Sequence, residues 1–225
     1  RWETVATDGR YAWHDHRIHW MSPTAPRAVD QDGRVDLGGD DGTWSVPLTI
    51  DGRPTTVTGE LVLVDPPSPL PWVVLACAAA AATFGACARW GLRAGSAVGA
   101  TTGALAVIAA VATWRAVPAD AGASAVPVGV AVIALLAGAL GVAGPRAARL
   151  GAGAAAAAAL LGWGATRWTV LARAVLPTDL APVLDRGITA LAIGVGAGLA
   201  VALVVQPSPR GRPAGDPSVR SSPTA

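Results

Sequence analysis

The sequence predicts an α+β membrane protein, in which an N-terminal β-rich domain precedes a bundle of five transmembrane helices. The chain of 225 residues has a mean hydropathy of +0.45, and only 14% of its residues are charged. Soluble domains usually carry about 25% charged residues. The long apolar stretches all follow residue 65, whereas β-branched residues and turn signals mark the part before it.

We expect four segments along the chain. Residues 1–65 form an extracytoplasmic β-rich domain, and the proline-rich residues 66–71 link it to the membrane. The helical bundle covers residues 72–205. Residues 206–225 are rich in Pro, Ser and Gly and form a disordered cytoplasmic tail.

The N-terminal domain is predicted to consist of strands. The segments RYAWHDHRIHWM, TWSVPLTIDG and RPTTVTGELVLV contain β-branched and alternating residues. Asp51-Gly52 lies between the last two and is a strong signal for a β-hairpin turn. Because about 65 residues make a thin core, we expect further strands upstream of Arg1 to complete a sandwich-like domain.

Five stretches without charged residues are long enough to span a membrane, which takes about 17–25 residues. The fourth stretch is alanine-rich and only weakly hydrophobic, so we expect other helices to surround it. No titratable group that could relay protons or ions lies within these stretches, which disfavours a pump or a proton-coupled transporter. The predicted helices cover residues 70–88, 94–114, 121–144, 150–166 and 187–205.

The arginines predict the orientation of the bundle. Cytoplasmic loops of membrane proteins are enriched in Lys and Arg. With the N-terminal domain outside, the cytoplasmic loops and the tail contain seven arginines, Arg89, Arg93, Arg146, Arg149, Arg210, Arg212 and Arg220. We therefore predict a multi-pass cell-membrane protein with its N-terminal domain outside and its C-terminus in the cytoplasm.

Glycine recurs every four residues near the second stretch, at Gly91, Gly95, Gly99 and Gly103. Residues with this spacing lie on one face of a helix. Small residues there allow the backbone of a neighbouring helix to approach closely. We interpret these glycines as a helix-packing ridge.

The segment YAWHDHRIHWM contains all three histidines of the chain and its single methionine. In a strand, His14 and His16 point to the same side, so both imidazoles can bind one metal ion. His19 and Met21 can join them after a bulge or turn, and a thioether favours copper over zinc. Asp15 and Arg17 are candidate groups that orient these ligands. In the alternative interpretation, the histidines and tryptophans only pack the β-domain onto the membrane and bind no metal.

Other functional classes find less support. Neither Ser nor Cys is paired with a base at a recognisable spacing, so we predict that the protein is not an enzyme. No basic patch is interleaved with aromatic residues, which argues against nucleic-acid binding. The predicted partners are the lipid bilayer and a protein of the cell envelope.

The segments WHDHRIHWM and WSVPLTIDGRPTTVTGELVLVDPPSPLPW resemble a group of uncharacterised membrane proteins of high-GC Gram-positive bacteria. The resemblance covers roughly residues 1–75, and the helices only in character. It implies an extracytoplasmic β-domain followed by a few helices, and an actinobacterial source. The layout is also similar to that of bacterial copper-resistance proteins. Because the apolar stretches contain no histidine, this departure argues against copper transport and leaves copper binding outside the membrane open.

Overall fold

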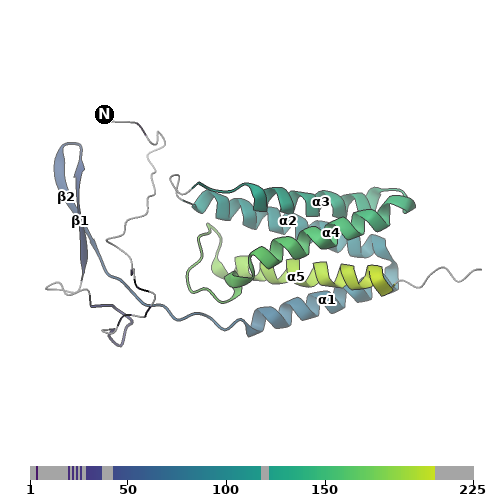
Figure 1. Ribbon diagram of the computed structural model, residues 1–225, viewed down its shortest axis with the longest axis horizontal. Coiled ribbons are helices and arrows are strands. Elements are labelled where there is room, and N and C mark those ends of the chain that lie inside the picture. Colours follow the sequence, from purple (N-terminus) through teal and green to yellow (C-terminus); the bar gives the residue numbers. More distant parts are fainter. Residues whose placement is uncertain are drawn as a thin grey trace, which may run out of the picture.

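The computed structural model describes residues 4, 20, 22, 24 and 26 and the ranges 29–36, 43–117 and 122–205. Its described part contains a small β-hairpin followed by a helical bundle (Figure 1). The elements, in chain order, are β1 (Trp44–Ile50), β2 (Arg53–Gly59), α1 (Leu70–Trp90), α2 (Leu92–Ala116), α3 (Val126–Ala143), α4 (Arg146–Thr166), the short 3-10 helix η3 (Trp168–Leu171) and α5 (Pro182–Val205).

The hairpin forms where the turn signal predicted it. Strands β1 and β2 pair antiparallel, and Ile50 lies opposite Arg53 at the closed end. Asp51 and Gly52 both have positive φ, 51° and 75°, as a two-residue type I′ turn requires. At the open end, the ring of Trp44 lies directly over Gly59 on the opposite strand, and this contact helps to fix the register.

The predicted sandwich remains a prediction. Within the described residues, the sheet has two strands, supplemented by isolated bridges between Val29 and Val35 and between Arg34 and Val62. Val35 and Val46 are the buried apolar side chains of this region. Apart from Trp20, the predicted strand at residues 10–21 lies outside the described residues.

The five long helices form one bundle, in which each helix is antiparallel to the next along the chain (Figure 1). Helices α1, α3 and α5 begin at the end that faces the hairpin, which we call the near end, and α2 and α4 begin at the far end. Pairs α1/α5, α2/α3, α3/α4 and α4/α5 pack together, and α5 also contacts α2. Four of the helices, α1, α2, α3 and α5, are long and apolar enough to cross a membrane. The protein is therefore an integral membrane protein.

Several helix boundaries differ from those predicted. Helix α5 begins at Pro182, five residues before the predicted Gly187, and α4 begins at Arg146 rather than at residue 150. Helix α1 begins at Leu70, as predicted, so it includes the last two residues of the predicted linker. Helix α3 begins only at Val126, after Gly122 with a φ of 67°. The earlier starts of α4 and α5 share one cause, because a helix end can extend past the apolar stretch and carry charged residues.

Close backbone contacts join α2 to α3. A Cβ atom added to Gly103 would lie 2.5 Å from the backbone nitrogen of Leu135, and one added to Gly138 would lie 2.5 Å from that of Ala100. Both positions therefore require glycine, as is typical of tightly packed membrane helices.

The four evenly spaced glycines do not form one continuous ridge. Gly91 lies outside the helices, where its φ of 81° makes the break between α1 and α2. Gly95 and Gly99 face Leu199 of α5, whereas Gly103 faces α3. The prediction of a helical ridge formed by four glycines is thus wrong at Gly91, because α2 begins one residue later, at Leu92.

Candidate functional site

The first turn of α5 contains a charged side chain buried in the bundle. The side chain of Asp185 is 1% exposed, and the side chain of Arg167, just after α4, is 10% exposed. The Nη2 atom of Arg167 donates hydrogen bonds of 2.6 and 2.8 Å to the two carboxylate oxygens of Asp185. Charged groups within membrane segments are costly, and they mark functional positions unless structure alone requires them.

Arg167 connects three helices at the near end. It donates a 3.1 Å hydrogen bond from Nη1 to Oγ1 of Thr113 in α2. Its guanidinium carbon lies 4.9 Å from the ring centroid of Trp163 in α4, at the distance of a cation–π contact. Together with Asp185 in α5, these contacts hold α2, α4 and α5 around one guanidinium group. We call Thr113, Trp163, Arg167 and Asp185 the charged clamp.

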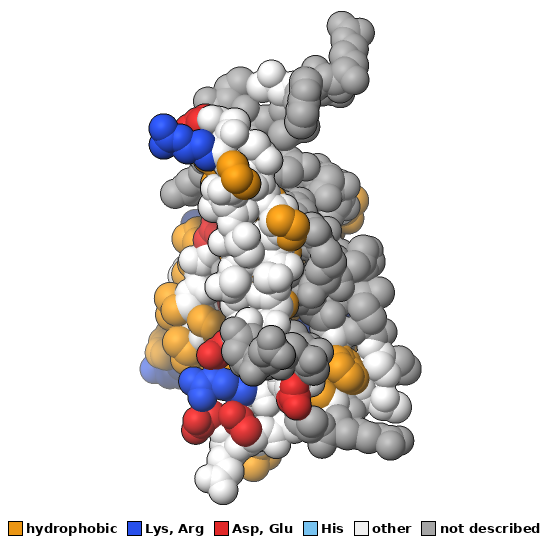
Figure 2. Space-filling model, turned by 90° about the vertical axis from the view of Figure 1, so that its left-hand side faces the viewer, with side chains coloured by type: hydrophobic (Ala, Val, Ile, Leu, Met, Phe, Trp, Pro, Cys, Tyr) orange, Lys and Arg blue, Asp and Glu red, His pale blue; other side chains and the backbone are white. Residues whose placement is uncertain are grey.

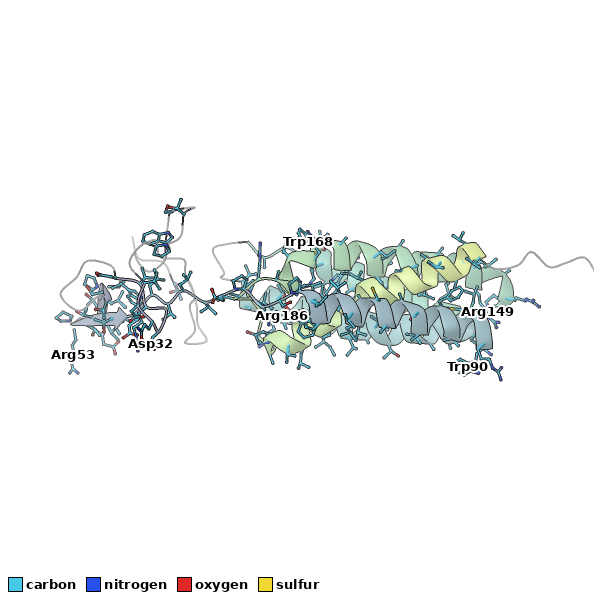
Figure 3. The ribbon with its side chains drawn as sticks, turned by 90° about the horizontal axis from the view of Figure 1, so that it is seen from below. Asp32, Arg53, Trp90, Arg149, Trp168 and Arg186 are labelled. Carbon is cyan, nitrogen blue, oxygen red and sulfur yellow. The ribbon has the colours of Figure 1, made fainter. Side chains whose placement is uncertain are left out.

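Arg186 extends the clamp to the loop that precedes α5. Its Nη2 atom donates a 2.7 Å hydrogen bond to the carbonyl of Arg173, and its Nε atom donates one of 3.3 Å to the carbonyl of Val170. Figure 3 places Arg186 and Trp168 together at the near end of the bundle. The backbone carbonyls of this loop therefore gain donors from α5, which is what backbone groups away from water need.

The clamp also favours the start of α5 electrostatically. A carboxylate near a helix N-terminus is stabilised by the partial positive charge of the helix end. Asp185 lies in the first turn of α5, and its backbone carbonyl accepts a 2.9 Å hydrogen bond from Oγ1 of Thr189. The geometry holds helix ends together; within the described residues it places no nucleophile beside a base.

The predicted metal ligands lie outside the described residues. This applies to His14, His16, His19 and Met21, and also to Asp15 and Arg17. Among the residues that the structure describes, no group of three or more His, Cys, Asp and Glu side chains is placed to hold a metal ion. Copper or zinc binding therefore stays a prediction.

The acidic loop before the hairpin has a structural role in its described part. The carboxylate of Asp30 accepts hydrogen bonds from the backbone amides of Asp32 and Arg34, at 2.9 and 2.8 Å. Arg34 in turn donates to Glu60 over 2.7 Å, and this hydrogen bond is the main cause that raises the pKa of Arg34. Acidic and basic side chains lie side by side on the face shown in Figure 2.

Sequence reasoning missed the charged clamp. The predicted fifth helix begins at Gly187, which leaves Asp185 and Arg186 outside it. The segment PVLDRG nevertheless contains a helix-start signal, since Pro at the first helical position and an acidic residue in the first turn are typical of helix N-termini. This signal would have moved Asp185 into α5.

No family model, curated protein or solved structure matches this chain. The fold and the clamp therefore define its class directly, as a multi-pass integral membrane protein whose helices are joined by a buried ion pair at the near end.

We predict that Asp185→Asn lowers the free energy of unfolding by about 3–5 kcal/mol, because it leaves the Arg167 guanidinium buried and unpaired. The measurement is unfolding of the purified protein in mixed micelles with rising dodecyl sulfate, followed by far-UV circular dichroism.

The matched control is Asp179→Asn. Asp179 faces Arg115 at 3.9 Å in an exposed pair at the same end, so its loss is expected to change stability by no more than about 1 kcal/mol. Equal losses in the two variants would contradict a special role for the clamp.

Proposed function

We propose that this protein is a cell-membrane anchor that crosses the bilayer five times and holds its N-terminal β-region at the outer face. The observation that carries this proposal is the course of α4. Helix α3 ends at the far end and α5 begins at the near end (Figure 1), so α4 takes the chain from one end of the bundle to the other. With 21 residues and a rise of about 1.5 Å per residue, α4 is long enough to span the hydrocarbon core.

The packing of α4 explains how an alanine-rich helix is kept in the bilayer. Its buried residues include Ala156, Leu160 and Trp163, and it contacts α2, α3 and α5. A Cβ atom added to Gly196 of α5 would lie 3.0 Å from the backbone nitrogen of Leu161 in α4. Close packing of this kind drives helix association in membranes, so α4 does not depend on its own hydropathy.

Five crossings place the two ends of the chain on opposite sides of the membrane. The helix ends at the far end contain Arg89, Arg93, Arg146 and Arg149, which supports a cytoplasmic far end. The hairpin then lies outside the cell. The bundle is held together by backbone contacts and by the charged clamp, and this suits a rigid support for an outer domain.

The hairpin region supports a role in binding another protein of the cell envelope. Ile50 at its tip is 52% exposed, and the consecutive residues Val62, Leu63 and Val64 are about half exposed. A two-stranded hairpin has little stability of its own, and exposed strand edges can accept a further strand from a partner.

The topology can be tested by introducing single cysteines into a chain whose Cys77 and Cys87 are replaced by alanine, and we predict which of them are labelled from outside the cell. A membrane-impermeant maleimide is expected to label Asp51→Cys and Thr178→Cys in intact cells, and Pro145→Cys only after lysis. Labelling of Pro145→Cys and Thr178→Cys from the same side would contradict a spanning α4. Labelling of Pro145→Cys alone in intact cells would contradict the orientation.

A second candidate function is transition-metal binding, copper before zinc, by the outer region. The observation that favours it is the concentration of all three histidines of the chain within residues 14–19, two residues before Met21. Imidazole and thioether ligands suit copper.

We predict that the full-length, chelator-treated protein in detergent binds one copper ion tightly, and that His14→Ala/His16→Ala loses this binding. Isothermal titration with Cu(I) and with Zn²⁺ measures both. The matched control, Cys77→Ala/Cys87→Ala, is expected to bind like the parent chain. Weak and equal binding in the parent and the histidine variant would reject the metal site and leave protein binding as the role of the outer region.

A further inference from the structure

The far end of the bundle contains a basic pocket that the charged clamp does not involve. It has a volume of about 770 Å³ and lies between the α1–α2 connection, the start of α4 and the end of α5. Figure 3 shows Trp90 and Arg149 at this end. Three arginines line it, Arg93, Arg146 and Arg149, and no acidic residue does. We call it the arginine pocket.

Two of the three arginines are held in place by backbone carbonyls. Arg93 donates from Nε to the carbonyl of Val142 over 2.8 Å, and Arg149 donates from Nε to the carbonyl of Gly144 over 3.3 Å. These bonds fix the direction of two guanidinium groups, whose Nη atoms have no acceptor among the described residues. The ion pairs within the described part of the chain involve Arg34, Arg115 and Arg167 and none of these three arginines.

The N-termini of two helices lie at the same pocket. Helix α2 begins at Leu92 and α4 at Arg146, and both residues line the pocket. Neither N-cap residue, Gly91 or Pro145, provides a side-chain hydrogen bond to the first turn. Free N–H groups and the helix dipole favour an anion at such ends, and they add to the charge of the arginines.

The rest of the pocket wall is apolar. Phe84, Leu150 and Val205 line it and are all exposed. Trp90, 69% exposed, also lines it, and indole rings favour the headgroup level of a membrane. A site with guanidinium groups at the helix ends and apolar side chains beside them fits a molecule with an anionic head and an acyl tail.

We propose that the arginine pocket binds an anionic phospholipid. Its phosphate accepts charge-assisted hydrogen bonds from Arg93, Arg146 and Arg149, and its acyl chains lie against Phe84 and Leu150. Basic pockets between transmembrane helices bind anionic headgroups in this way, and arginine presents a fork of donors that matches a phosphate. The site does not depend on the proposed anchoring function or on the orientation of the bundle.

The test is native mass spectrometry of the full-length protein in detergent, titrated with phosphatidylglycerol, phosphatidylethanolamine or glycerol 3-phosphate. We expect phosphatidylglycerol to bind at least about tenfold more tightly than the other two. Arg146→Gln/Arg149→Gln is expected to remove this preference, because loss of a charge-assisted hydrogen bond changes affinity by about tenfold. The side chain of Arg146 makes no hydrogen bond to a described residue. The single substitution Arg146→Gln therefore tests the effect of charge without disturbing the hydrogen bond from Arg149 to Gly144.

The matched control is Arg115→Gln/Arg173→Gln, which removes the same charge at the near end and is expected to leave the preference unchanged. Far-UV circular dichroism confirms that each variant is folded. Equal binding of the two phospholipids, an equal loss in the control, or glycerol 3-phosphate binding as tightly as phosphatidylglycerol would overturn the proposal.

Discussion

The near end of the bundle depends on the ion pair between Arg167 and Asp185. Removing two charges from water is expensive, and their attraction compensates only when the geometry is good and the remaining donors find acceptors. Here one guanidinium nitrogen contacts both carboxylate oxygens, a second reaches Thr113, and the ring of Trp163 lies beside the cation. Elsewhere the buried core of α2, α4 and α5 consists mainly of Ala, Leu, Ile and Val, so the clamp adds a charged contact to an otherwise apolar packing.

The two ends of the bundle use arginine differently. At the near end, Arg167 donates to the carboxylate of Asp185 and Arg186 donates to carbonyls of the preceding loop, although the buried Nε atom of Arg167 has no partner among the described residues. At the far end, Arg93 and Arg149 donate from their Nε atoms to backbone carbonyls, and their Nη atoms have no hydrogen bond to a described residue. One end is thus fixed by contacts between side chains of different helices, whereas the arginines of the other end contact backbone carbonyls.

The sequence predicted those features that depend on local chemistry. Asp51-Gly52 predicted the hairpin, because two successive positive φ angles are needed there, and the apolar stretches predicted five helices. The start of α5 was missed, because Asp185 and Arg186 were read as loop residues. The clamp could not be predicted from periodicity, since Arg167 finds its partners 18 and 54 positions away in the sequence. Which helices bring such residues together is decided by packing. The histidine segment lies outside the described residues, so its metal-binding interpretation stands on sequence alone.

The most direct test of the clamp is a double-mutant cycle with Arg167→Leu, Asp185→Leu and the double variant, unfolded in mixed micelles. A cycle isolates the energy of the pair from the effect of each substitution. We expect a coupling free energy of about 2–3 kcal/mol, because the double variant leaves no unpaired charge. A coupling below about 0.5 kcal/mol would contradict the account and assign the stability of the near end to helix packing alone.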